Sequence, residues 1–149
     1  MLFKLPKKGL KIAHINICSL RNNLSDLTEI LQPNNLHILA VSETHVDYSF
    51  DDATLRIDGY NIFRNDRNIY GGGVAIYIQN HTPVQVMPDL MYSSIEVIWL
   101  KVSLKHLKPI LIGCCYRPPN ANSEYLDKIC DMLDHVSSMN MEIYLMGDF

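Results

Sequence analysis

Two hydrophobic periods alternate along this chain. In residues 20–32 the apolar positions recur every three or four residues, which predicts an amphipathic helix that ends at Pro33. A second stripe of the same kind follows the turn and helix-start residues 120–123 and continues to about residue 138, so it predicts a second helix. The other apolar runs are shorter or alternate with period two, and they predict strands.

The predicted strands alternate with the two helices. They comprise residues 10–17, 36–41, 60–63, 74–78, 95–104, 109–116 and 142–146. The alternation in 95–104 places Ile98, Leu100, Val102 and Leu104 on one face and Ile95, Val97 and Trp99 on the other. Residues 36–41 and 109–116 are apolar throughout, as is typical of strands covered on both faces, and we expect the same of the last strand. This order predicts an α/β fold with mixed sheets and covering helices.

Composition narrows the class of protein. The chain has 149 residues, of which 48% are hydrophobic and 19% charged, so it can form one domain or part of a larger one. A formal net charge of -3 argues against a general polyanion-binding surface. With no long apolar run and no signal peptide, an intracellular location is the default expectation. The four cysteines form no CxxC pair and lie in apolar runs, so we expect reduced core residues.

Four predicted strands end in a polar residue, namely Asn16, Glu43, Tyr116 and Asp148. If these strand ends share one edge, the four side chains converge on a pocket rim, where ligands of α/β proteins usually bind. Two carboxylates and an amide suit Mg²⁺, which takes one or two carboxylates and keeps several waters. Taken singly, each residue also fits an ordinary turn or strand exit, so the hypothesis depends on the whole set.

The same residues lie in a recognisable series of short elements. In chain order these are residues 14–17, 42–45, 71–76, 116–119 and 147–149. Their order and spacing resemble the endonuclease/exonuclease/phosphatase superfamily, and most closely the apurinic-type endonuclease domain of non-LTR (LINE-like) retrotransposons. The resemblance extends from about residue 10 to residue 149. It implies a four-layer α/β sandwich, in which two packed sheets are each covered by helices.

The resemblance also implies roles for individual residues. Glu43 would be the main ligand of Mg²⁺, or of Mn²⁺ in its place, and Asn16 would complete the metal and phosphate network. Tyr116 would donate a hydrogen bond to the scissile phosphate, and Asp148 would orient or deprotonate the attacking water. The implied reaction is hydrolysis of a DNA phosphodiester to leave a nick, in the nucleus if the chain serves a retroelement. His45 belongs to the element around Glu43, and we expect no direct catalytic role for it.

Three arginines are candidate contacts to DNA phosphates. Arg117 follows Tyr116 directly and is the best candidate, whereas Arg64 and Arg67 are weaker because a solvated loop paired with Asp66 explains them equally well. The triple glycine of residues 71–73 is not followed by the Lys-Ser/Thr of a P-loop, so we expect it to permit close backbone packing or a bulge. The basic lead-in of residues 1–9 is expected to be solvated.

The chain departs from the family pattern after residue 149. The family continues with an Asn, a later Asp and an Asp-His pair, none of which lies in this sequence. We therefore expect the N-terminal portion of the domain, with the C-terminal half missing. It would supply roughly one sheet and half the core, be inactive or impaired on DNA, and self-associate or pair with the missing half. Two alternatives stay open: a phosphoesterase acting on lipid or inositol phosphates, and a non-catalytic retroelement relic or truncated gene product.

Overall fold

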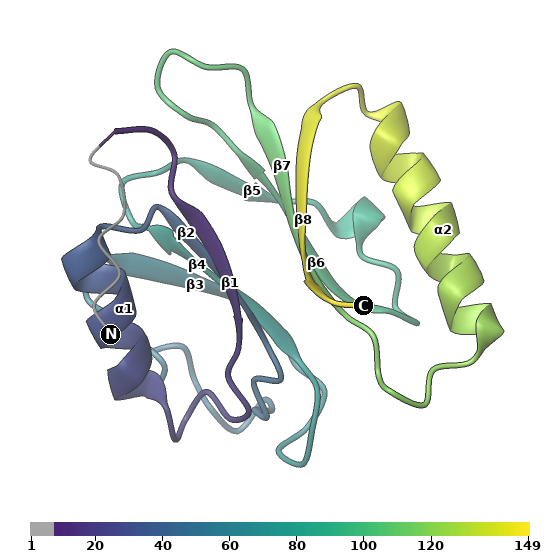
Figure 1. Ribbon diagram of the computed structural model, residues 1–149, viewed down its shortest axis with the longest axis horizontal. Coiled ribbons are helices and arrows are strands. Elements are labelled where there is room, and N and C mark those ends of the chain that lie inside the picture. The colour runs from purple at the N-terminus through teal and green to yellow at the C-terminus, as the bar shows by residue number, and fades with distance from the viewer. Residues whose placement is uncertain (1–7) are drawn as a thin grey trace.

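In residues 8–149, two four-stranded sheets pack face to face, and each has one α-helix on its outer side (Figure 1). This computed structural model describes residues 8–149, so most of the predicted lead-in 1–9, including Lys4 and Lys7, lies outside the described residues. The α/β class predicted from the sequence is confirmed. The expectation that the chain supplies roughly one of the two sheets is wrong, however, because it contributes four strands to each of two sheets.

The first sheet has the strand order β1-β2-β4-β3. Strands β1 (Ile12–Asn16) and β2 (Ile38–Ser42) are parallel, and helix α1 (Leu24–Asn34) connects them. Strands β4 (Val74–Gln79) and β3 (Tyr60–Asn65) are antiparallel to their neighbours. All residues of β2 and β4 are buried. For β2 this confirms the cover on both faces that the apolar run of residues 36–41 predicts.

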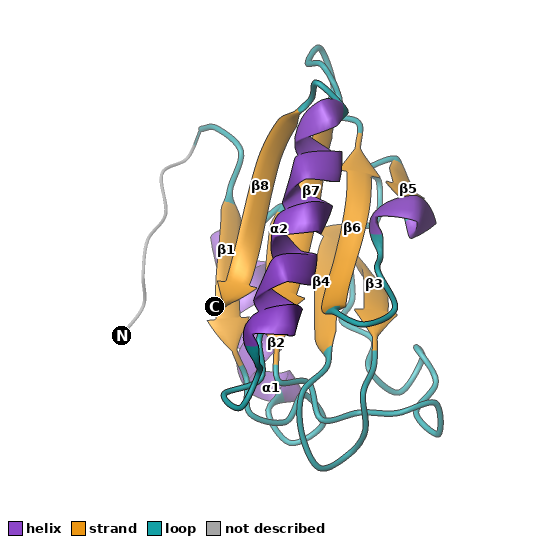
Figure 2. Cartoon of the chain, turned by 90° about the vertical axis from the view of Figure 1, so that its right-hand side faces the viewer, coloured by secondary structure: helices purple, strands orange, loops and turns teal. Residues whose placement is uncertain are grey.

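The second sheet has the strand order β5-β6-β7-β8. It begins with the short strand β5 (Val84–Val86) and the single 3-10 turn η1 (Pro88–Leu90), neither of which the sequence pattern predicts. Strands β6 (Glu96–Val102) and β7 (Ile110–Tyr116) are antiparallel, whereas β7 and β8 (Glu142–Asp148) are parallel and joined by helix α2 (Ser123–Ser138). Figure 2 shows α2 lying along the outer face of this sheet.

Strand β6 has one hydrophobic core on each face: one lies between the two sheets, and the other lies between the second sheet and α2. Ile98 and Leu100 pack between the sheets, whereas Val97 and Trp99 pack beneath α2 with Ile129. This division confirms the alternation predicted for residues 95–104. It follows from the period of two along an extended chain, which assigns successive side chains to opposite faces.

The ends of helix α1 differ from the prediction. The helix begins at Leu24 instead of residue 20, because Asn23 donates two side-chain hydrogen bonds to the carbonyls of Ile17 and Ser19 and holds the preceding residues in a turn. Pro33 does not stop the helix, since it lies in the last turn and the left-handed residue Asn35 provides the C-cap.

Strand β8 is less covered than its sequence predicts. Ile143 and Leu145 pack under α2, and Met146 packs against the core between the sheets. Tyr144 keeps 37% of its surface exposed. The expectation of complete cover on both faces was therefore wrong, because β8 is an edge strand with one paired neighbour. Within residues 8–149, no helix has the length and apolar character needed to span a membrane.

Candidate active site

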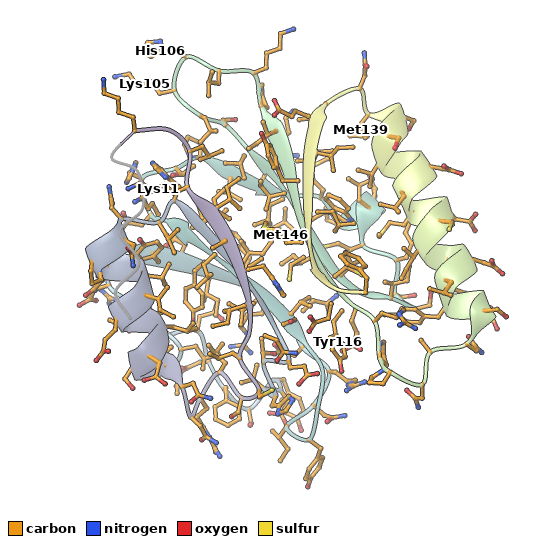
Figure 3. All side chains as sticks on the ribbon, in the orientation of Figure 1. Lys11, Lys105, His106, Tyr116, Met139 and Met146 are labelled. Atoms are coloured by element: carbon orange, nitrogen blue, oxygen red, sulfur yellow. The ribbon has the colours of Figure 1, made fainter. Side chains whose placement is uncertain are left out.

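The two parallel strand pairs end side by side and bring the predicted polar residues together. Asn16 lies opposite Ser42 at the ends of β1 and β2, and Tyr116 lies opposite Asp148 at the ends of β7 and β8. Across the two sheets, Asn16 Nδ2 donates a 2.7 Å hydrogen bond to Asp148 Oδ2. Tyr116 lies in the half of the molecule away from Lys105 and His106 (Figure 3).

Glu43 stands on a strained backbone at the end of β2. Its φ is 54°, in the left-handed region that residues with a side chain seldom adopt. Three backbone hydrogen bonds hold this loop: Ser19 N–H donates to the carbonyl of Glu43, and the N–H groups of Thr44 and His45 donate to the triple glycine. The left-handed conformation turns the chain sharply at the strand end, next to the other polar residues.

The Glu43 carboxylate collects several hydrogen-bond donors. Cys18 Sγ lies 3.3 Å from Oε2, and hydrogen bonding from the side chains of Tyr116 and Asn16 also acts on the pKa of the carboxylate. Partial burial works to raise the pKa of Glu43, but these donors outweigh it, so the pKa is lowered. His45 Nε2 lies 3.8 Å from Oε2, close enough for a weak ionic contact when the ring is protonated. Glu43 therefore presents an anion at neutral pH.

Asp148 is held by a short hydrogen-bond chain that the sequence did not reveal. Ser42 Oγ donates to Asp148 Oδ2 at 2.9 Å, and His14 Nε2 lies 3.0 Å from Ser42 Oγ. Because the Ser42 hydroxyl gives its proton to Asp148, His14 is the donor in its contact with Ser42. Burial lowers the pKa of His14, against an opposing effect of the Asp148 charge. His14 precedes Asn16 by two positions, so the period of a strand could have pointed to it.

Cys18 also belongs to this site, contrary to the expectation that all four cysteines are core residues. Cys114 and Cys115 are buried in β7, but Cys18 and Cys130 are exposed. Cys18 Sγ lies 3.2 Å from Asn16 Oδ1 and 3.3 Å from Glu43 Oε2, so the two oxygens share its single proton as acceptors. Its left-handed backbone, with φ 45°, removes it from the end of β1 and turns its side chain into the polar site. All four cysteines are free thiols, as predicted.

Tyr116 ends β7 with its hydroxyl toward Glu43. Burial, together with the hydrogen bond to Glu43 and its negative charge, raises the pKa of Tyr116 to about 12. The phenol is therefore protonated at neutral pH and can act as a hydrogen-bond donor. The guanidinium carbon of Arg67 lies 5.8 Å from the centre of the ring, within the range of a cation–π contact.

The three arginines have different surroundings. Arg64 is engaged inside the protein: its guanidinium donates to the carbonyls of Phe50 and Asp47 and pairs with Asp66 at 2.7 Å, and only 12% of its side chain is exposed. This geometry does not support a phosphate contact by Arg64. Arg67 pairs with Glu96 at 3.4 Å and is 38% exposed. Arg117 is half-buried directly after Tyr116, and its backbone N–H donates to the carbonyl of Asp148.

The oxygen donors at this edge suit a hard divalent cation. Glu43 offers an ionised carboxylate, Asn16 an amide oxygen beside it, and Asp148 a second carboxylate. No cluster of three or more His, Cys, Asp or Glu side chains is arranged to hold a metal within the described chain. Mg²⁺ does not need such a cluster, because it is commonly bound through one or two carboxylates with waters and substrate oxygens as further ligands. The donor set therefore fits Mg²⁺.

Comparison with solved structures identifies this arrangement of sheets. The chain superimposes on the endonuclease domain of TRAS1, a telomere-specific non-LTR retrotransposon, with a TM-score of 0.68 at 14% identity. An AP endonuclease from Archaeoglobus fulgidus gives a TM-score of 0.69 at 22% identity, and the 3'-5' exonuclease NExo from Neisseria meningitidis gives 0.71 at 20%. Each superposition covers 94% of this chain.

The chain has the fold of the endonuclease/exonuclease/phosphatase superfamily. It spans 57–58% of the length of these three chains. No protein-family model and no curated protein matches the sequence. The superfamily resemblance suggested by short ordered elements is thus confirmed at the level of the fold.

Proposed function

We propose that this chain carries the metal-binding and phosphate-binding residues of a Mg²⁺-dependent phosphodiesterase that nicks DNA. The observation that carries the proposal is the convergence of Asn16, Glu43, Tyr116 and Asp148 from four strands of two sheets. Carboxylate, amide and phenol groups gathered at one sheet edge are a suitable set for hydrolysis of a phosphodiester.

Each residue has a distinct part in this proposal. Glu43 and Asn16 hold the cation, which when bound withdraws charge from the phosphoryl oxygens. The protonated phenol of Tyr116 donates a hydrogen bond to a non-bridging oxygen and stabilises the charge that develops there. Asp148, fixed by Asn16 and Ser42, orients the attacking water and accepts its proton. Arg117 is the proposed phosphate contact outside the reacting group.

DNA is the proposed substrate for two reasons. The similar structures include an AP endonuclease and the endonuclease domain of a retrotransposon, and one structure of NExo is described as bound to a product DNA hairpin. In addition, the sequence elements that resemble the superfamily are closest to those of retrotransposon endonucleases. Because a mannosyl-6-phosphatase shares the fold, the fold alone does not determine the substrate.

The test is nicking of supercoiled plasmid by the protein in Mg²⁺, with EDTA as the metal-free control. We expect Glu43→Ala and Asp148→Asn each to lower the nicking rate at least about a hundredfold. Glu29→Ala, on the exposed side of α1, is the matched control and should leave the rate unchanged. Nicking that resists Glu43→Ala would contradict the proposal, as would hydrolysis of an inositol phosphate without any nicking of DNA.

A further inference from the structure

An ion pair of Arg67 and Glu96 lies between the triple glycine and Tyr116. Arg67 Nη1 is 3.4 Å from Glu96 Oε2. Glu96 is the register partner of Tyr116 in the antiparallel pair of β6 and β7, so its backbone position is fixed opposite that residue. The pair therefore connects the loop after β3 to β6, the strand next to the one that presents the phenol.

Each member of the pair has a further fixed partner. Arg67 Nε donates to the carbonyl of Gly71 at 2.9 Å, and Glu96 Oε1 accepts from the backbone N–H of Gly73 at 2.8 Å. The backbone N–H of Glu96 donates to the hydroxyl of Tyr125, which in turn donates to the carbonyl of Tyr116 at 2.8 Å. Both side chains are thus held at more than one atom, which limits the rotamers available to them.

The triple glycine supplies the space that this arrangement needs. A Cβ at Gly72 would lie 2.4 Å from both Arg67 Nε and Glu96 Oε1, and a Cβ at Gly71 would lie 2.8 Å from an Arg67 nitrogen. Gly72 also has a φ of +64°, which disfavours any other residue. The triple glycine was expected to permit close backbone packing or a bulge. It does permit close packing, but the nearest groups are the side chains of Arg67, Glu96 and Thr44.

We propose that Arg67 and Glu96 are positioning residues for Tyr116, and that Arg67 acts through the tyrosine ring and not as a phosphate ligand. The guanidinium covers the ring of Tyr116 at 5.8 Å from its centre, while the phenol hydroxyl contacts Glu43. The ring is therefore held between a cation fixed by Glu96 and the carboxylate at the end of β2. The effect on catalysis rests on the proposed function, but the effect on the ring does not.

Loss of the pair should release the ring and not remove a substrate contact. Displacement of a catalytic group by about 1 Å can cost on the order of a hundredfold in rate. In Arg67→Ala we expect kcat to fall by about tenfold to a hundredfold, with KM within about twofold of the parent value. If Arg67 were a phosphate ligand, Arg67→Ala would instead raise KM and leave kcat nearly unchanged, because the loss of a ligand weakens substrate binding.

The test begins with a measurement that needs no activity. The protein is labelled with ¹³Cζ-tyrosine, and the resonance of Tyr116 among the eight tyrosines is assigned with Tyr116→Phe. We expect Arg67→Ala and Glu96→Gln to shift this resonance, and Arg67→Lys to restore it in part, since lysine keeps the charge but loses the bond to Gly71. Arg56→Ala, which removes an exposed arginine paired with Asp58, is the control and should leave it unmoved.

The combined outcomes separate this inference from the proposed function. A shifted Tyr116 resonance with a selective fall in kcat supports both. A shifted resonance in a protein whose hydrolysis of DNA resists Glu43→Ala overturns the proposed function and leaves the positioning role intact. An unmoved Tyr116 resonance in folded Arg67→Ala overturns the positioning role, and so does a rise in KM with kcat unchanged.

Discussion

Asn16 Nδ2 donates to Asp148 Oδ2 over 2.7 Å, although the two residues are 132 positions apart in the chain. The bond joins the edge strand β1 of one sheet to the edge strand β8 of the other. It also aligns the amide beside Glu43 with the carboxylate proposed to orient water. One contact therefore contributes to the packing of the sheets and to the geometry of the site.

Replacing Asn16 should measure the contribution of this contact to stability. Asn16→Ala loses a hydrogen bond to a charged group and should lower the free energy of unfolding by about 1 kcal/mol, because the site is open to water. Asn16→Asp places two carboxylates together and should cost more at pH 7. Urea unfolding at pH 7 measures both. Equal stability of Asn16→Asp and the parent protein would show that the contact does not join the sheets in solution.

Arg64 and Arg117 should differ in what their loss affects. Arg64 is mostly covered and donates to carbonyls and to Asp66, so Arg64→Ala should lower the free energy of unfolding by roughly 1–3 kcal/mol. Arg117→Ala should leave stability nearly unchanged but weaken binding to a DNA duplex and reduce its salt dependence. Thermal melts and fluorescence anisotropy at several salt concentrations give the two quantities. A lower salt slope for folded Arg64→Ala would restore Arg64 as a phosphate contact.

Gly113 allows Trp99 to lie flat on the second sheet. A Cβ at this position would lie 2.6 Å from the indole ring, and Trp99 is fully buried. Gly113→Ala should therefore overpack this core and destabilise the fold by about 1–3 kcal/mol. The double variant Gly113→Ala/Trp99→Leu should recover part of the loss relative to Trp99→Leu alone, as a double-mutant cycle of urea unfolding would measure. Additive losses would indicate that the two residues do not compete for space.

Stability should decrease as the pH falls from 7 to 5. Burial lowers the pKa of His37, with smaller contributions from Lys11 and His81, and burial also lowers the pKa of His14. In the unfolded chain both histidines have their ordinary pKa of about 6.5, so below that pH the unfolded chain binds more protons than the folded chain. The contribution of the two histidines to stability is therefore complete above about pH 6.5 and is lost as the pH falls through their lower pKa values in the folded chain.

His37→Gln isolates one part of this dependence, because glutamine can still accept the hydrogen bond that Lys11 N–H donates to His37 Nδ1. The free energy of unfolding, measured by urea at intervals from pH 5 to 7, should change less steeply in the variant. An unchanged slope would show that His37 titrates alike in the folded and unfolded chains.

The sequence predicted most of the sheet elements because burial imposes a visible period. The alternation around Trp99 and the apolar runs ending at Glu43 and Tyr116 are direct consequences of strands covered on one or two faces. The strand β5 was missed because three residues with two exposed side chains leave no such period. The start of α1 was missed because a side-chain hydrogen bond from Asn23, not periodicity, decides it.

The sequence predicted only those residues of the site that end a hydrophobic run. Asn16, Glu43, Tyr116 and Asp148 end hydrophobic runs, so their positions can be read from the chain. His14, Ser42 and Cys18 reach the same site through register and left-handed backbone, which depend on contacts between distant segments. The internal partners of Arg64 likewise come from the loop of residues 47–52, and only the folded chain brings them together.

The most direct test of the account is the binding of Mn²⁺, as a paramagnetic substitute for Mg²⁺, measured by the loss of its free electron paramagnetic resonance signal. The account predicts one site per chain that Mg²⁺ competes for, that Glu43→Gln abolishes and that Asn16→Ala weakens. Glu29→Ala should bind like the parent protein. Mn²⁺ binding that is absent from the folded parent protein, or that is unchanged in Glu43→Gln, would contradict the claim that these strand ends form a metal-assisted phosphodiesterase site.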